Sequence, residues 1–277
     1  MGVLRPPTTT PVGPPDDAGW SGPACQTGRV SAPDPSTRAA TPDALAALGP
    51  FFAVDRHEPA AFPPSPWQSI GDLAAPGEIL RARVRRVRSA LAARGRRSPD
   101  QVELRVAVSV AHLGLVARLI APAVGAAALG DAIDLTVDRI WWQDEWGGPY
   151  PLSVPAPVPV PVRVPVPTEP WTPDPIRLFG SAVEAITRAF LAAYSVSPRV
   201  LWGNVASAAV SAAGLTAAAR PDLAAAARAA ADAVLADERV EDGALRAGPG
   251  FRRRSCCLIY RLARSTAAAC GDCVLAA

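Results

Sequence analysis

The clearest helical pattern in the chain lies between residues 78 and 94. Leu80, Val84, Val87 and Leu91 fall at positions i, i+4, i+7 and i+11, so they form one apolar stripe along a helix. The other faces of this helix carry five arginines, namely Arg81, Arg83, Arg85, Arg86 and Arg88. We interpret this arginine face as solvated, and a docking patch for an anionic ligand is the alternative.

Start signals place further helices in the first half. Thr41 followed by Pro42 predicts a helix start, because threonine is an N-cap residue and proline suits the first helical position. Residues 98–101 (SPDQ) form a capping box with proline at that same position. The run behind it is apolar nearly all round, which predicts a buried helix to about Ile120 that Pro122 stops or kinks.

Two segments in the middle of the chain predict β-structure. Residues 133–142 alternate well enough between two faces to form a strand. The next segment, residues 151–167 (PLSVPAPVPVPVRVPVP), places most of its prolines on alternate positions. Amides alternate sides along a strand, so the missing N–H groups fall on one edge and predict a strand at the edge of a sheet. A free polyproline II linker is the alternative.

The second half reads as helical. Segments near 174–195, 198–214 and 221–237 each have a proline just inside the start, and Gly214 is a plausible stop for the second. A polar, glycine-rich stretch then leads to the cysteine-rich end of the chain. We therefore expect an α+β fold that is mainly helical, with a small sheet and a C-terminal cysteine-rich tail.

Composition divides the chain into three parts. Residues 1–40 contain 8 prolines and 5 glycines without apolar periodicity, which predicts a disordered N-terminus. Residues 41–170 form an N-terminal region of helices and a small sheet that ends in the proline–valine run. Residues 171–277 form a helical region that carries the cysteine tail.

Charge and residue usage exclude several classes of protein. The 28 basic and 25 acidic residues leave a net charge of +3, so strong attraction to nucleic acid is not indicated. All basic residues are arginine, which excludes a Walker-type lysine and a Schiff base. The most apolar stretch, residues 106–129, is interrupted by His112, Arg118 and Pro122, and the N-terminus lacks the apolar stretch of a signal peptide. We expect a cytoplasmic protein without an integral membrane segment.

The cysteines carry the chemistry. Cys25 lies alone, whereas Cys256, Cys257, Cys270 and Cys273 form a C-C-x12-C-x2-C pattern. Four thiols in a reducing compartment point to a metal or redox site. Adjacent side chains diverge in an extended chain, and structural zinc sites usually open with C-x2–4-C, so the bare pair argues against an ordinary zinc site. A [2Fe–2S] cluster, in which each iron takes two cysteines, is favoured over zinc and over a disulfide.

Residues 255–261 (SCCLIYR) and 270–273 (CGDC) resemble the C-terminal signature of the ferric-siderophore reductases of the FhuF family. Residues 201–204 (LWGN) and, more weakly, 117–122 (ARLIAP) extend the resemblance over about residues 100–277. It implies a [2Fe–2S] cluster on the four cysteines and one-electron reduction of a ferric siderophore. The electrons would come from a separate donor of the reduced ferredoxin or flavoprotein type.

This sequence departs from the family pattern between Cys257 and Cys270. The loop holds twelve residues instead of ten, and residues 263–269 replace a Pro-Gly-Gly-Gly tract. Because backbone amides near a cluster tune its potential, the departure leaves the potential open.

Other residues are candidates for docking or charge balance. Arg252, Arg253 and Arg254 directly precede the cysteines and would attract an anionic chelate or an acidic donor, or else balance the cluster's charge. Trp202 and Asn204 would pack beside the cluster or the ligand, or else in a helix core.

The competing functions are a non-enzymatic module that binds zinc or senses redox state, and a diverged cluster protein that reduces another acceptor. A hydrolase or transferase is disfavoured, because no nucleophile–base set appears and the chain has only two histidines. Of these, His112 is expected to be a hydrogen-bonded core residue.

Overall fold

The computed structural model describes residues 41–75, 77–157, 175–263 and 270–275. The predicted disorder of residues 1–40 lies outside this part of the chain. The fold is mainly helical with one small sheet. Its helices are α1 (Pro42–Ala46), α2 (Ile70–Ala74), α3 (Glu78–Arg94), α4 (Leu104–Ala128), α5 (Pro175–Ala193), α6 (Pro198–Ala219), α7 (Ala224–Leu235) and α8 (Tyr260–Ala263).

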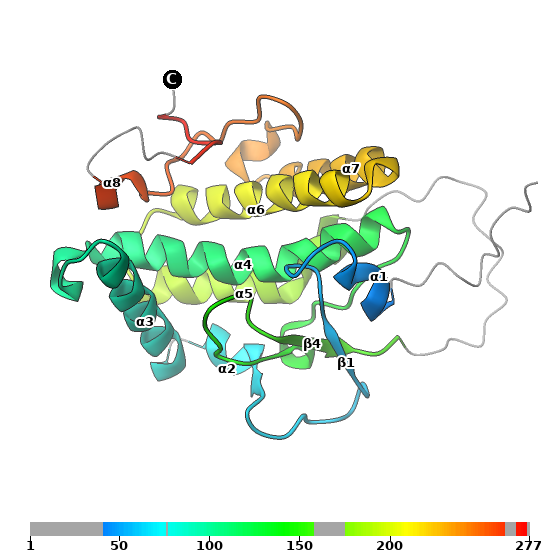
Figure 1. Ribbon diagram of the computed structural model, residues 1–277, viewed down its shortest axis with the longest axis horizontal. Coiled ribbons are helices and arrows are strands. Elements are labelled where there is room, and N and C mark those ends of the chain that lie inside the picture. Colours follow the sequence, from blue (N-terminus) through cyan, green and yellow to red (C-terminus); the bar gives the residue numbers. More distant parts are fainter. Residues whose placement is uncertain (1–40, 76, 158–174, 264–269, 276–277) are drawn as a thin grey trace, which may run out of the picture. The chain divides into compact units, whose positions relative to one another are not determined.

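The hydrophobic core is built around α4, which packs against α3, α5, α6 and α7 (Figure 1). Most of its side chains are buried, among them Leu115, Leu119 and Val124. The regions on either side of residue 170 share this core, because α5, α6 and α7 come from the second region and α4 from the first. The helix predicted for residues 78–94 is confirmed with the same bounds as α3.

By length and composition alone, α4 and α6 would both be able to cross a membrane. In the structure, 78% of the apolar window of α4 and 61% of that of α6 are buried inside the protein. A core helix has the same composition as a membrane span when it is covered on all sides by other elements.

The sheet has four short strands in the order β1-β4-β3-β2. They are β1 (Asp55–His57), β2 (Gln68–Ser69), β3 (Trp141–Trp142) and β4 (Leu152–Pro155). β1 pairs with β4 in parallel, with Asp55 opposite Ser153, and the other pairs are antiparallel. The proline run was predicted to form an edge strand. This prediction is wrong for its described part, because β4 pairs with β1 on one side and with β3 on the other. Residues 158–167 of the proline run lie outside the described residues.

The strand predicted over residues 133–142 is much shorter in the structure. Only Trp141 and Trp142 of the segment 133–142 form a strand. Asp134 accepts the N–H of Thr136 at 2.9 Å and binds Arg139, which closes a turn in place of a ladder.

The helix stops predicted at Pro122 and Gly214 do not occur. α4 runs through Pro122, because burial of the helix on most sides offsets one lost hydrogen bond. α6 likewise continues past Gly214 to Ala219, and the buried residues Ala212, Ala213 and Thr216 hold this part of the helix in the core.

The local capping predictions hold. The N–H of Ala44 donates to the Thr41 hydroxyl at 3.1 Å, and the capping box at residues 98–101 is present. That box opens a 3-10 turn (Pro99–Gln101), and α4 itself begins at Leu104.

The arginine face of α3 is only partly solvated. Arg83 and Arg86 both bind Asp144, and their guanidinium carbons lie 4.6 and 4.9 Å from the ring centroid of Trp146. Two of the five arginines therefore fasten a loop onto the helix, which corrects the interpretation of a wholly solvated face.

We expect Phe52→Ala to lower the free energy of unfolding by about 3–5 kcal/mol, because this fully buried ring packs beside α4 at Gly125. Phe62→Ala is the matched control, since its ring is 83% exposed, and it should change stability by less than about 1 kcal/mol. Urea denaturation followed by circular dichroism measures both. Equal losses in the two variants would contradict this placement of the core.

Candidate metal centre

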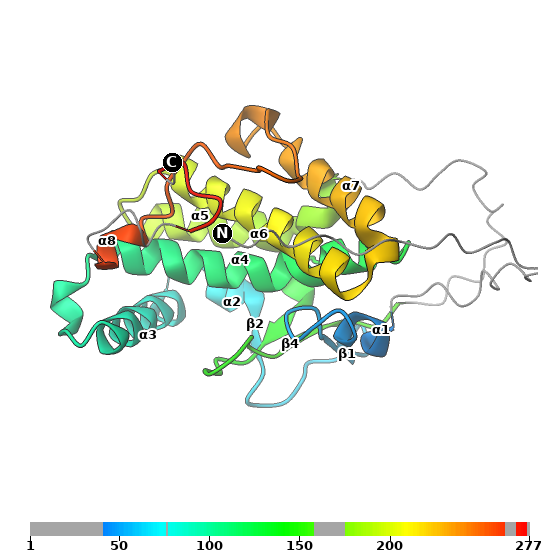
Figure 2. The same cartoon turned by 45° about the horizontal axis from the view of Figure 1, so that its top comes forward.

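The four tail cysteines form two close pairs. The Sγ atoms of Cys256 and Cys273 are 4.0 Å apart, and those of Cys257 and Cys270 are 3.3 Å apart. Cys257 and Cys273 are buried, whereas the other two are half-buried. All four thiols are free, so the disulfide alternative is wrong for this structure. Figures 1 and 2 show the tail, in orange and red, crossing α6.

A sharp bend follows the adjacent cysteines Cys256 and Cys257. Leu258 follows them with a φ of 68°, in the left-handed region that non-glycine residues rarely adopt. Its N–H donates to the Cys256 sulfur at 3.3 Å. At the other end of the tail, the N–H of Leu275 donates to the Cys273 sulfur at 3.4 Å. One pair of sulfurs, Cys256 and Cys273, therefore has a backbone donor on each member.

Glu241 holds the chain just before the cysteines. Its carboxylate accepts the N–H groups of Arg254 and Ser255, each at 3.1 Å, and the Ser255 hydroxyl at 2.7 Å. Glu241 and Asp242 have φ values of 53° and 61°. Such conformations cost about 1–3 kcal/mol each and persist where the surroundings enforce them. The strained turn aims one carboxylate at the tail.

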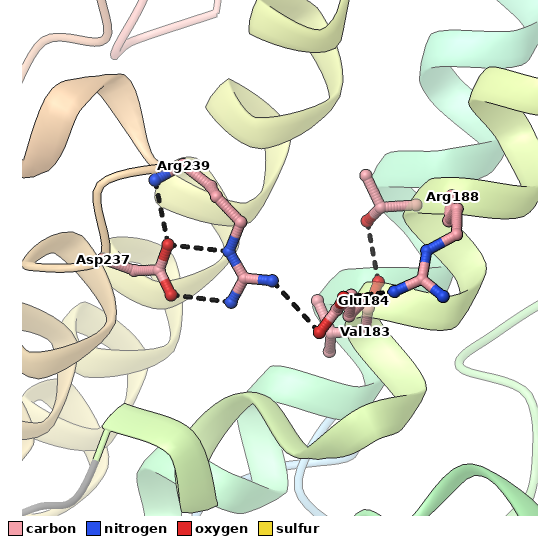
Figure 3. A network of polar contacts seen from close by, with 6 residues as sticks. Val183, Glu184, Arg188, Asp237 and Arg239 are labelled. Carbon is pink, nitrogen blue, oxygen red and sulfur yellow. Dashed lines mark hydrogen bonds and ion pairs between the residues drawn. The ribbon is translucent and has the colours of Figure 1, made fainter.

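Arg239 fastens that turn to the helices (Figure 3). Its guanidinium donates to Asp237 at 2.7 and 2.9 Å and pairs with Glu184 of α5 at 3.1 Å. It also lies over the ring of Trp202 on α6, 4.7 Å from the centroid. The turn that presents Glu241 is thus tied to two core helices.

The segment LWGN on α6 forms the floor under the tail. A Cβ on Gly203 would collide with the Ser255 hydroxyl and lie 2.6 Å from Nη2 of Arg253. Asn204 is fully buried, donates to the Ser109 carbonyl at 3.0 Å and accepts from Arg253 at 3.0 Å. Trp202 is 9% exposed. Burial of Trp202 and Asn204 agrees with the second of the two roles expected for them, packing in a helix core, and a place beside a ligand stays a prediction.

His112 is a core residue, as predicted. It is fully buried, and its Nε2 lies 3.0 Å from the Thr187 hydroxyl. Burial, with a smaller contribution from the charge of Arg253, lowers the pKa of His112 to about 3. The imidazole is therefore neutral and supplies no charge to the tail.

The three arginines before the cysteines have different surroundings. Arg253 is 1% exposed, and its N–H donates to the Asp272 carbonyl at 3.0 Å. Arg254 is exposed and lies 3.9 Å from Asp242. Arg252 is exposed and donates to the Cys273 carbonyl at 3.2 Å. Burial leaves little of Arg253 accessible, so its expected docking role stays a prediction.

Comparison with protein families identifies the tail. Residues 253–275 match the model of the FhuF 2Fe-2S C-terminal domain. The tail is therefore similar to FhuF 2Fe-2S C-terminal domains, which supports a [2Fe–2S] cluster on its cysteines. Comparisons with curated proteins and with solved structures give no significant match.

The sulfur geometry fits the [2Fe–2S] cluster of an FhuF domain. A tetrahedral centre with metal–sulfur bonds of about 2.3 Å places two sulfurs about 3.8 Å apart, close to both observed separations. Cys256 and Cys273 would hold one iron, and Cys257 and Cys270 the other. This division resolves the difficulty of the adjacent cysteines, since neighbouring side chains that diverge reach different irons.

Burial raises the pKa of the Cys270 thiol, and the nearby Cys257 and Asp272 raise it further. Burial also raises the pKa of Cys256, with Cys273 adding to the effect. Thiolates are the ligating form, so cluster assembly must displace protons from these buried thiols.

Sequence reasoning missed Gly203 and Glu241. The sequence contained a clue to Gly203, because this glycine belongs to the LWGN segment. The structure shows the reason, since a larger side chain there would collide with the tail. Glu241 had none, since its role depends on a left-handed backbone and on contacts across the fold.

We expect Gly203→Ala to displace the tail and to lower the cluster content, with an overpacking cost of about 1–3 kcal/mol. Gly214→Ala on the same helix meets open space and should leave the cluster intact while stabilising the helix by about 0.5–1 kcal/mol. Iron and sulfide analysis with visible absorption measures the cluster. Full cluster content in Gly203→Ala would contradict the close contact between α6 and the tail.

Proposed function

We propose that this protein is a cytoplasmic ferric-siderophore reductase. The observation that carries the proposal is the placement of Cys257 and Cys270 on the wall of an accessible groove within an FhuF 2Fe-2S domain. When bound, the cluster supplies reversible one-electron transfer between a donor and the ferric ion of a chelate. Fe(II) is a softer and less charged ion, so the hard oxygen donors of the chelate release it.

The groove lies between α4, α6 and the tail and has a volume of about 310 Å³. Its lining is mostly apolar, with Leu113 and Ala117 from α4 and Ala208 and Ala212 from α6. Ligand pockets usually range over about 300–1,000 Å³, so this one admits part of a chelate. A chelate seated there lies against the edge of the cluster held by Cys257 and Cys270.

The chain's own residues have three tasks in this proposal. The cysteines hold the two irons, and Glu241 and Asn204 hold the tail rigidly on α6 so that little rearrangement accompanies electron transfer. Arg252 and Arg254, both exposed beside the cysteines, offer positive charge to an acidic donor of the reduced ferredoxin or flavoprotein type.

Cys256→Ser and Cys270→Ser are each expected to remove the visible absorption of the anaerobically purified protein and its EPR signal after dithionite. Each should also abolish reduction of a ferric trihydroxamate chelate, followed by trapping Fe(II) as a coloured complex. Cys25→Ser is the matched control and should keep both. A loaded cluster that reduces no ferric chelate would leave a redox-sensing module, and one zinc per colourless chain would leave a structural metal site.

Ser211→Trp should raise KM for the ferric chelate at least about fivefold, because this exposed serine lines the groove and a bulky ring there blocks entry. The cluster's EPR spectrum should stay unchanged. Ala218→Trp, on the exposed side of α6, is the control and should leave KM as it is. Steady-state kinetics across chelate concentration separates the two, and an unchanged KM in Ser211→Trp would remove the groove from the substrate path.

A further inference from the structure

Arg253 is the most buried arginine in the described part of the chain, at 1% exposure. The next, Arg118, is 3% exposed and donates to the carbonyls of Phe51, Ala53 and Tyr150, none of which belongs to the tail. Arg253 instead reaches from the chain before the cysteines down to α6. It is a cation enclosed at the base of the cluster site.

The partners of the Arg253 guanidinium are neutral. Nη1 donates to the Asn204 side chain at 3.0 Å and lies 3.3 Å from the Ser207 hydroxyl. Nη2 donates to the Val200 carbonyl at 3.1 Å and lies 3.3 Å from the Ser255 hydroxyl. Nε is buried and has no hydrogen-bond partner among the described residues. Within these residues, none of the ion pairs includes Arg253.

A buried charge that lacks a paired opposite charge is strongly unfavourable, and proteins normally pair such groups or bind an ion beside them. Two carboxylates reach Arg253 only through a hydroxyl. The Ser207 hydroxyl donates to Asp272, and the Ser255 hydroxyl donates to Glu241. The guanidinium therefore has dipoles around it and an unsatisfied N–H, but no direct counter-ion in the described protein.

The tail supplies the missing negative charge when it is loaded. Arg253 lines the same groove as Cys257 and Cys270, which would hold one of the two irons. Four thiolates and two sulfides outweigh the charge of two ferric ions, so the oxidised cluster is an anion and reduction makes it more negative. A fixed cation beside it stabilises the reduced form more than the oxidised form.

We propose that Arg253 is the buried counter-charge of the cluster and that it raises the cluster's reduction potential. The proposal rests on the [2Fe–2S] centre of the FhuF domain and on no particular electron acceptor. Its test is independent of siderophore reduction, so either hypothesis can fail without the other.

The test is an EPR-monitored redox titration of the loaded full-length protein. Arg253→Met removes the charge and keeps an apolar stem, and the ratio of reduced to oxidised cluster at a fixed solution potential should fall at least tenfold. For a one-electron couple this is a decrease of 59 mV in the midpoint. Arg253→Lys keeps the charge and should stay closer to the unmodified protein. Arg254→Met, which removes an exposed charge one residue away, should shift the midpoint much less.

Stability provides a second readout that a purely structural role would not produce. Arg253→Met should destabilise the loaded protein against urea more than the cluster-free protein, because only the loaded form contains the anion. Equal losses in both forms would overturn the proposal. The proposal would also be overturned if Arg253→Met shifted the midpoint potential no more than Arg254→Met does. It would likewise be overturned if Arg253→Lys lowered the midpoint potential as much as Arg253→Met. If Arg253→Met fails to load a cluster, Arg253→Lys decides the question, because a midpoint fall in that variant larger than the shift of Arg254→Met would overturn the proposal.

Discussion

The contact on which the metal centre depends is the close approach of the cysteine tail to α6 at Gly203. A helix surface normally keeps another backbone at the distance set by its side chains. At Gly203 the side chain is absent, so Ser255 and Arg253 enter that space, and Arg253 bonds to Asn204 and to the Val200 carbonyl of the helix. Among its described residues the tail has only the short helix α8 as regular structure, so this contact is needed to fix the tail on α6.

Strained backbone conformations and buried polar side chains are concentrated around that contact. Three non-glycine residues close to the cysteines, Glu241, Asp242 and Leu258, adopt left-handed backbone angles. Asn204 and Arg253 are buried polar side chains that bond to each other. Features of this kind destabilise an ordinary core and are retained where they position chemistry. Their concentration beside the cysteines separates this region from the alanine-rich packing of α4, α6 and α7.

The paired arrangement of the sulfurs connects geometry with redox behaviour. Cys256 and Cys273 receive backbone N–H donors, whereas Cys257 and Cys270 face the groove. Donors to sulfur stabilise negative charge on a cluster, and exposure allows an acceptor to approach. Within the described residues the two pairs of sulfurs thus differ. Cys256 and Cys273 accept backbone N–H groups, whereas Cys257 and Cys270 line the groove.

Local signals determined much of this protein in advance. The stripe on residues 78–94, the caps at Thr41 and Ser98, and the spacing of the four cysteines depend on neighbours within a few positions, so the sequence alone predicts α3, the helix starts and the iron–sulfur tail. The end of α4 and the turn at Asp134 were mispredicted, because packing around Pro122 and a side-chain bond outweighed local propensity.

Only the tertiary structure decided which side chains serve the site. Three successive arginines look alike in sequence, yet one is buried and two are exposed, because the path of the tail over α6 turns Arg253 inward. Glu241 becomes an anchor through a strained turn far from the cysteines in the chain. Such roles depend on distances between segments that no local pattern encodes, and burial then converts an ordinary charge into one that requires an opposite charge nearby.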